Sequence, residues 1–206
     1  MKKIIIAIDS FKGCLTSAEA GKAAEKGIKS INPSCHTSVI PIADGGEGLL
    51  DVLITATKGK YITLSAHGPL MKMAKTHYGL SGNGRTAIIE MAAISGLPLV
   101  PIEQRNPMLT TTFGTGELIK DALNKGCRNF IIGIGGSATN DAGLGMLQAL
   151  GFRFLDKSGH TLGTGGQIME AVANIDTSGI HPALRETHFM VACDVANPFY
   201  GPDGAA

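Results

Sequence analysis

The sequence predicts an α/β protein, and its first sixty residues give the strongest signal. Apolar strand-like runs at residues 3–8 and 37–42 are each followed by a segment with helical periodicity. Strands and helices that alternate in this way are typical of a parallel sheet. Further along, residues 81–84 (Ser-Gly-Asn-Gly) separate two strand-like runs and predict a hairpin. The chain is therefore expected to combine a parallel β-α-β-α part with a mixed sheet.

The elements of the first part follow one another closely. Residues 3–8 are continuously apolar, as in a parallel strand that is buried on both faces. Thr16-Ser17-Ala18-Glu19 fits a capping box and predicts that a helix begins there. Residues 37–42 predict the second strand, and the leucines and isoleucines after Glu47 predict the second helix.

The second part has a different rhythm. Strands are predicted at residues 75–80, 85–91, 130–134, 152–155 and 188–193, and helices at residues 115–124 and 141–150. The change from β-α alternation to a hairpin predicts a domain boundary near residues 67–70. This boundary divides the chain into residues 1–67 and 68–206.

The composition narrows the function classes. A chain of 206 residues with 44% hydrophobic residues and a net charge of +1 is typical of a soluble globular protein. The small net charge gives no reason to expect nucleic acid or an anionic membrane as partner, and no apolar run is long enough to span a bilayer. The four widely spaced cysteines predict reduced thiols and a cytoplasmic location, and the histidines lack paired metal spacing. The oligomeric state stays open.

Two glycine-rich acidic stretches, residues 43–48 and 135–143, are the most informative feature of the sequence. Each follows a predicted strand and leads into a predicted helix. Backbone N–H groups at a helix N-terminus attract anions such as phosphate, and a nearby carboxylate can hold Mg²⁺ or accept a proton. The first stretch contains Asp44, Gly45, Gly46 and Glu47, with more glycine than a helix cap requires. Phosphate chemistry is therefore favoured over simple capping.

The second stretch permits three interpretations. Its hydroxyl, amide and carboxylate groups suit phosphate and Mg²⁺, and the candidate ligands are Gly135, Gly136, Ser137, Thr139, Asn140 and Asp141. The spacing Gly133-x-Gly135-x-x-Ala138, with Asp156 beyond it, also matches a loose dinucleotide fingerprint and leaves an NAD(P)-dependent oxidoreductase as the rival. A glycine-rich packing turn is the third interpretation. The first β-α unit lacks that fingerprint, and no G-x-x-x-x-G-K-[ST] occurs, which excludes a P-loop.

Three further groups are candidates by position. Asp9, Ser10 and Lys12 follow the first strand, at the edge where open α/β sheets bind ligands, although all three also suit a solvated turn. Asp194 and Asn197 follow the last predicted strand and are candidates for a general base or metal site, or for a turn. The threonines at residues 110–112 and 115 are interpreted as a helix start with Thr115 as N-cap, slightly ahead of ligand binding.

Taken in order, five motifs resemble the bacterial glycerate kinase family, in the variant that makes 2-phosphoglycerate. They are residues 9–13 (Asp-Ser-Phe-Lys-Gly), residues 43–48, Asn106-Pro107 with Thr110-Thr111-Thr112, residues 135–143, and Asp194-Val195-x-Asn197-Pro198. Family members often have glycine where this chain has Ala142. The family continues well past Ala206, so the resemblance implies an N-terminal portion. A non-catalytic structural fragment is therefore a third hypothesis beside the kinase and the oxidoreductase.

The resemblance implies an incomplete flavodoxin-like domain in residues 1–67 and an inserted α/β domain in residues 68–206, cut short, with the active site in the cleft between them. It implies ATP-dependent, Mg²⁺-assisted phosphorylation of D-glycerate. Lys12 would neutralise charge, and Asp44 and Asp194 would activate the hydroxyl or hold Mg²⁺. The substrate or phosphate ligands would be Asp9, Ser10, Gly45, Gly46, Glu47, Gly135, Gly136, Ser137, Thr139, Asn140, Asp141 and Asn197.

Overall fold

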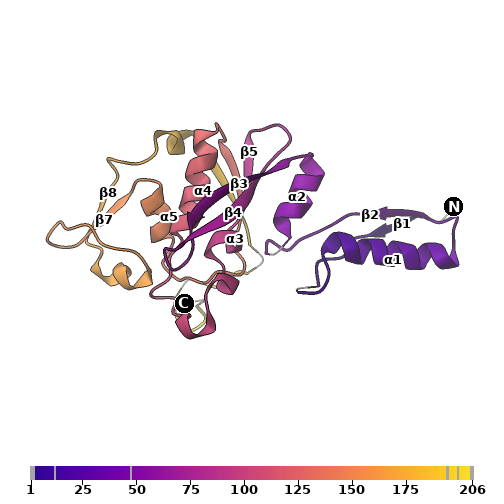
Figure 1. Cartoon of the computed structure of the whole chain (residues 1–206), viewed down its shortest axis with the longest axis horizontal. Helices are drawn as coiled ribbons and strands as arrows, with labels where there is room; N and C mark the ends of the chain where they lie inside the picture. The colour runs from indigo at the N-terminus through magenta and orange to yellow at the C-terminus, as the bar shows by residue number, and fades with distance from the viewer. Residues whose placement is uncertain (1–2, 12, 47, 194, 199, 205–206) are drawn as a thin grey trace.

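The computed structural model describes residues 3–11, 13–46, 48–193, 195–198 and 200–204 (Figure 1). The elements in chain order are β1 (Lys3–Ile6), α1 (Ser17–Ile31), β2 (His36–Val39), α2 (Leu49–Thr57), β3 (Lys60–His67), β4 (Met73–Leu80), β5 (Thr86–Glu90), α3 (Ala92–Ser95), α4 (Phe113–Asn124), β6 (Asn129–Gly133), α5 (Leu144–Ala149), β7 (Arg153–Leu155), β8 (Asn174–Asp176) and β9 (His188–Ala192). Short 3-10 helices η1 to η4 lie at Leu97–Leu99, Ile102–Gln104, Gly166–Ala171 and Pro182–Glu186. The predicted α/β class is confirmed.

The first unit consists of β1, β2 and α1, and it extends away from the rest of the molecule (Figure 1). β1 and β2 pair in parallel from Lys3↔His36 to Ile6↔Val39. α1 begins with the expected capping box: the Thr16 hydroxyl accepts a hydrogen bond from the Glu19 backbone, and the Glu19 carboxylate accepts one from the Thr16 backbone. The prediction that the first strand is buried on both faces is wrong, since Ile5 is 61% exposed. In this two-stranded sheet only the α1 side is covered.

The second unit is built on a mixed five-stranded sheet of order β3-β4-β5-β6-β9. β4 runs antiparallel to both of its neighbours, β3 and β5. β6 runs parallel to both of its neighbours, β5 and β9. The predicted hairpin between β4 and β5 is confirmed, with Gly84 in the left-handed region at φ 69°. The register aligns Glu90 with Gly133 and Gly133 with Ala192, so the carboxyl ends of three parallel strands share one edge.

Helices cover both faces of this sheet. Ile89 belongs to the larger core, in which α4 packs through Leu118 and Ile119. Its neighbour Ile88 faces the opposite way and packs against Leu50 and Ile54 of α2. The buried side chains of Leu50 and Ile54 thereby fix α2 to the sheet. The described residues contain no helix that is long and apolar enough to cross a membrane.

The strand β3 was missed by the sequence analysis and bears on the domain boundary. It pairs with β4 along eight residues, from Lys60↔Leu80 to His67↔Met73. Its signal was a short alternation in which Ile62, Leu64 and Ala66 turn towards the core. The pair spans the predicted boundary, so this pairing does not support a break at residue 67. The division into residues 1–67 and 68–206 stays a prediction.

Candidate active site

The two glycine-rich acidic stretches meet at the carboxyl edge of the five-stranded sheet. A Cβ atom added to Gly133 would lie 2.6 Å from the Gly45 carbonyl oxygen, and one added to Gly135 would lie 2.9 Å from the Gly46 Cα. Gly45 also contacts the end of β9, where an added Cβ would lie 2.8 Å from the Ala192 oxygen. Segments some ninety residues apart are thus brought into backbone contact at the ends of β6 and β9.

These contacts give the glycines a packing function. Any side chain at Gly45, Gly133 or Gly135 would separate the two backbones, because real Cβ atoms do not approach other atoms this closely. The packing-turn interpretation therefore accounts for these three positions. Gly45, Gly48 and Gly136 also adopt positive φ, at 100°, 92° and 73°, which favours glycine at these three positions. Phosphate binding by the stretches stays a prediction.

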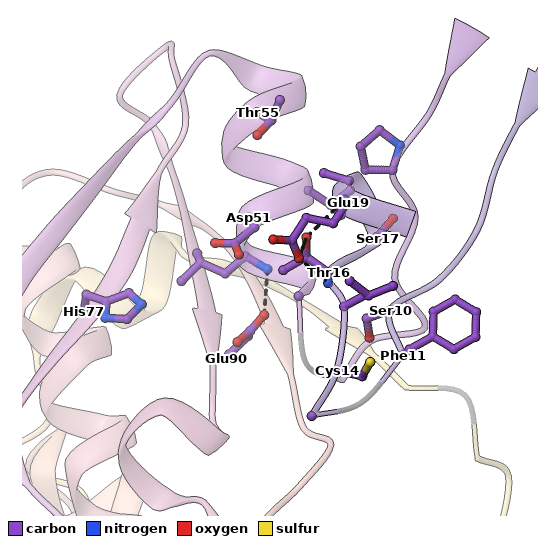
Figure 2. A pocket seen from close by; sticks show the side chains of 17 residues that line it. Ser10, Phe11, Cys14, Thr16, Ser17, Glu19, Asp51, Thr55, His77 and Glu90 are labelled. Atoms are coloured by element: carbon purple, nitrogen blue, oxygen red, sulfur yellow. Dashed lines mark hydrogen bonds between the residues drawn. The ribbon is translucent and has the colours of Figure 1, made fainter. Parts of the chain in front are cut away.

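A pocket of about 470 Å³ lies between the first unit and α2, close to this edge (Figure 2). Its walls come from the loop between β1 and α1, the first turns of α1 and α2, and the strands β4 and β5. The lining residues are Ser10, Phe11, Gly13, Cys14, Leu15, Thr16, Ser17, Ala18, Glu19, Pro41, Gly48, Leu50, Asp51, Val52, Thr55, His77 and Glu90. Ser10 and Gly48 connect the pocket to two of the motifs found in the sequence.

Glu90 is the pocket residue that sequence analysis missed and the structure singles out. It is the last residue of β5, and its Oε1 accepts a hydrogen bond of 2.8 Å from the Leu50 backbone, in the first turn of α2. Burial raises the pKa of the Glu90 carboxyl group, against hydrogen bonds from Leu50 and Gly48 that lower it. Within the described part of the chain, no lysine or arginine forms an ion pair with it. Its signal in the sequence was one acid at the end of an apolar strand.

Asp51 and His77 extend the polar side of the pocket. Asp51 accepts a hydrogen bond from the Tyr61 hydroxyl, and this bond is the main cause that raises the pKa of Tyr61 to about 12. His77 packs edge-on against the Tyr61 ring, with 5.6 Å between the ring centroids. Tyr61 therefore links these two pocket residues from outside the cavity.

The predicted residues near the first stretch are only partly described. Asp9 Oδ1 accepts a hydrogen bond from the Ser10 backbone at 2.6 Å, and Ser10 lines the pocket. Asp44 is exposed, and its Oδ1 accepts a hydrogen bond of 3.0 Å from the Gly46 backbone. Asn197 is also exposed and donates to the Asp203 carbonyl oxygen. Three predicted site residues, Lys12, Glu47 and Asp194, lie outside the described residues.

Asp141 has a structural environment that differs from the expected anion cradle. It is 2% exposed, and its carboxylate accepts hydrogen bonds from the Thr112 backbone (2.8 Å), the Thr111 and Thr112 hydroxyls, and the Gly143 and Gly145 backbones. The helix predicted from residue 141 begins at Leu144, because Asp141 itself binds the N–H groups before and within its first turn. The carboxylate joins residues 111–112 to α5.

The middle of the second stretch turns towards the same threonine segment. Ser137 donates to the Thr139 carbonyl oxygen, Thr139 donates to the Thr110 carbonyl oxygen, and the Asn140 backbone donates to Pro107. The stretch therefore divides into Gly135-Gly136 at the sheet edge and residues 137–141 against residues 107–112.

The threonine segment does form a helix start, as the favoured interpretation held, but its N-cap is Thr112. α4 begins at Phe113, and Thr115 lies inside it. The assignment of Thr115 as N-cap is wrong: its hydroxyl is fully buried and shares a 2.8 Å hydrogen bond with Ser95. This bond fixes α4 to α3.

Comparison with known proteins identifies the family. The sequence profile of the glycerate kinase family matches residues 4–206. The chain belongs to the glycerate kinase family.

Relatives of the chain include a glycerate kinase of Bacillus subtilis, 54% identical over 98% of this chain and 53% of the relative. A glycerate 2-kinase of Escherichia coli is 49% identical over 99% of this chain and 54% of the relative. The crystal structure of a glycerate kinase 2 from Salmonella typhimurium LT2 is 48% identical, with a TM-score of 0.89 over 99% of this chain and 55% of that chain. The chain spans about half the length of the curated relatives it matches.

The geometry around residues 133–143 does not fit the rival dinucleotide fingerprint, in agreement with membership of the glycerate kinase family. In that fingerprint the helix opens directly at the glycine turn, so that its N-terminus meets the pyrophosphate. Here residues 134–143 separate β6 from α5. Asp156, the expected ribose ligand, accepts hydrogen bonds from Ser158 and His160 in its own turn. The structure gives the oxidoreductase interpretation no support.

The metal expectation for this family member stays a prediction. Among the residues that the structure describes, no group of three or more His, Cys, Asp or Glu side chains is placed to hold a metal ion. Asp44, one of the two candidate Mg²⁺ ligands, uses Oδ1 for the Gly46 backbone, and no donor among the described residues occupies its Oδ2. A single exposed carboxylate suits Mg²⁺ that arrives with phosphate groups, because such Mg²⁺ keeps most of its water and phosphate ligands.

Proposed function

We propose that the full-length protein that carries this chain is a glycerate kinase, which transfers the γ-phosphoryl group of ATP to a hydroxyl of D-glycerate and yields 2-phosphoglycerate. The observation that carries the proposal is the match to the family across residues 4–206. Two of its motifs, residues 43–48 and 135–143, meet at one sheet edge. The substrates are small molecules, and the widely spaced cysteines favour the cytoplasm as its location. Because the chain spans about half of its relatives, the activity belongs to the full-length protein, and we expect the isolated chain to be inactive.

The geometry suits phosphoryl transfer, which depends on alignment and charge neutralisation more than on covalent chemistry. The loop after β1, the residues before α2 and the ends of β5, β6 and β9 come from five separate parts of the chain. All of them lie around the pocket or directly beside it. Such convergence at the carboxyl ends of parallel strands is where α/β proteins bind ligands.

The proposed roles are those that the family resemblance implies for each residue. Asp44, or Asp194 beyond the described residues, would accept the proton of the glycerate hydroxyl while its oxygen bonds to the γ-phosphorus and ADP leaves. The other carboxylate would bind the Mg²⁺ that accompanies ATP. Lys12 would neutralise phosphate oxygens.

The test is direct: incubate the full-length protein with D-glycerate, ATP and Mg²⁺ and follow the product by ³¹P NMR. Phosphorus on the 2-hydroxyl couples to one carbon-bound proton, whereas phosphorus on the 3-hydroxyl couples to two. We expect 2-phosphoglycerate, and a turnover about 100-fold lower in Asp44→Asn if Asp44 is the base. Asp156→Asn, in an exposed turn, is the matched control and should keep its turnover. ATP left unconsumed with D-glycerate would overturn the proposal.

A further inference from the structure

We propose that the pocket between the first unit and α2 binds the nucleoside part of ATP, and that Glu90 accepts a hydrogen bond from a ribose hydroxyl. The inference rests on the proposed function in taking ATP as the phosphate donor. It assigns the two ends of the nucleotide to different surfaces. The nucleoside occupies the pocket, and the phosphates extend to the glycine-rich edge.

The volume of the pocket favours a nucleoside over glycerate. At about 470 Å³ it lies within the range of small-molecule and cofactor sites, roughly 300–1,000 Å³. Glycerate, a three-carbon acid, would leave most of this space filled with water. A purine with its ribose is of the size that such a cavity encloses.

The charge of the pocket points the same way. Three lining residues are carboxylates, Glu19, Asp51 and Glu90, and the described lining residues include no lysine or arginine. Glycerate and phosphate are anions and would be repelled by these groups. The hydroxyls of ribose and the amino group of adenine are neutral donors, and ionised carboxylates only accept hydrogen bonds. The pocket therefore selects the uncharged, donor-rich end of ATP.

Glu90 is placed to make such a contact. Its carboxylate is half-buried, and its Oε1 accepts a hydrogen bond from the Leu50 backbone. Among the described lining residues, His77 is the basic side chain that acts on its charge, and no lysine or arginine pairs with it. Figure 2 shows Asp51 and Glu90 on one side of the pocket, with Ser10, Thr16 and Cys14 on the other. An acid at the end of a parallel strand is also a general means of holding ribose hydroxyls in α/β folds.

The remaining wall suits the base. Leu15, Pro41 and Val52 contribute apolar surface from three different segments. An apolar lining with a few polar groups is typical of sites for flat heterocycles. Gly48, which also lines the pocket, lies at the end of the first glycine-rich stretch. A nucleoside seated here can therefore direct its 5′ phosphates along residues 43–48.

The first experiment fills the pocket. Thr55 lines it from the exposed side of α2, whereas the neighbouring Ala56 is exposed and does not line it. In the full-length protein we expect Thr55→Trp to weaken adenosine binding, measured by calorimetry, and to raise KM for ATP about ten-fold or more. Its KM for D-glycerate should stay within about two-fold. Ala56→Trp, the matched control, should change neither.

The second experiment removes the charge. Glu90→Gln should weaken adenosine binding about ten-fold, since hydrogen bonds to charged groups are the stronger ones. Glu103→Gln, in an exposed 3-10 helix, is its control. Cys14 provides an independent readout, because it is exposed and lines the pocket. Adenosine should slow its alkylation and leave that of the exposed Cys193 unchanged.

The outcomes separate this inference from the proposed function. If glycerate is phosphorylated but Thr55→Trp raises only KM for D-glycerate, the pocket binds the acceptor and the inference is wrong. Unchanged adenosine affinity in Thr55→Trp would also overturn it. If the parent binds adenosine and Thr55→Trp does not, but the parent phosphorylates no glycerate, the pocket assignment is supported and the proposed function is wrong.

Discussion

Asp141 holds two segments of the chain together through one buried carboxylate. Donors from residues 111–112 and from the start of α5 surround it, and no other acceptor in the described structure replaces it for the Thr112 backbone. We predict that Asp141→Asn lowers the free energy of unfolding by about 2–3 kcal/mol, because an amide group presents donors to donors. Urea unfolding measures this cost. Asp156→Asn, on an exposed turn, should cost less than about 1 kcal/mol, and an equal cost in both variants would contradict the argument.

Ala142, beside it, adopts a backbone conformation that suits glycine. Its φ is 49°, in the left-handed region, where a Cβ atom costs roughly 1–2 kcal/mol. We predict that Ala142→Gly stabilises the protein by about 0.5–1 kcal/mol, since the entropy cost of glycine offsets part of the relief. The thermal midpoint should rise. Ala23→Gly, at an exposed position in the interior of α1, should destabilise by about 1 kcal/mol, and a fall in both variants would disprove the strain argument.

At this scale, sequence found the residues that occur in motifs and missed those that only tertiary contacts bring to the site. Asp44 and Asp141 carry glycine neighbours that mark them. Glu90 and Asp51 have no such neighbours, and they become pocket residues because α2 packs on β5. The chemistry of Asp141 was also misjudged, because three of its donors belong to Thr111 and Thr112, some thirty residues away in the chain.

Among the elements, the contact between the end of β5 and the start of α2 carries a buried charge. Burial raises the folded-state pKa of Glu90 above its ordinary value of 4.5. The folded protein therefore binds this proton more tightly than the unfolded chain, so stability falls as the pH rises from 4.5 through the raised pKa. We predict that Glu90→Gln is more stable than the parent at pH 7, and that the difference disappears below about pH 4.5.

Thermal unfolding across this pH range tests the prediction, with Glu103→Gln as the control that should follow the parent at every pH. A Glu90→Gln protein less stable than the parent at pH 7 would show that the α2 N-terminus stabilises the charge by more than burial costs. Stabilisation combined with weaker adenosine binding would mark Glu90 as a group kept for binding at the expense of stability.

The sequence predicted an element correctly where a few neighbouring residues are enough to determine it. The capping box at Thr16 and the glycine turn at residues 81–84 are local devices, and both are confirmed. β3 carries only a short alternation, and its place in the sheet depends on pairing with β4. The start of α5 moved to Leu144 because a buried carboxylate, not a helix propensity, determines it.

In the molecule as a whole, the sheet edges differ in cover. β6 is well buried, with Phe130 at 1% and Ile132 at 7% exposure, yet the neighbouring edge strand β9 exposes Met190 at 66% and Val191 at 54%. Ile5 in β1 is exposed as well. An edge strand with exposed apolar side chains tends to pair with another segment of the same chain or with another molecule. The sequence alone does not predict this asymmetry. A continuous apolar run predicts a buried strand whether or not another element of the described structure packs against it.

Because relatives of this chain are about twice its length, we predict that β9 is covered in the full-length protein. Met190→Lys should then change the free energy of unfolding of the 206-residue chain by less than about 0.5 kcal/mol. In the full-length protein it should cost about 2 kcal/mol or more, because a charge would be buried without a partner. Chemical denaturation of both proteins gives the two values. Ser65→Lys, at an exposed position on the opposite edge strand β3, should cost little in either. Equal effects of Met190→Lys in both proteins would mean that β9 remains an open edge.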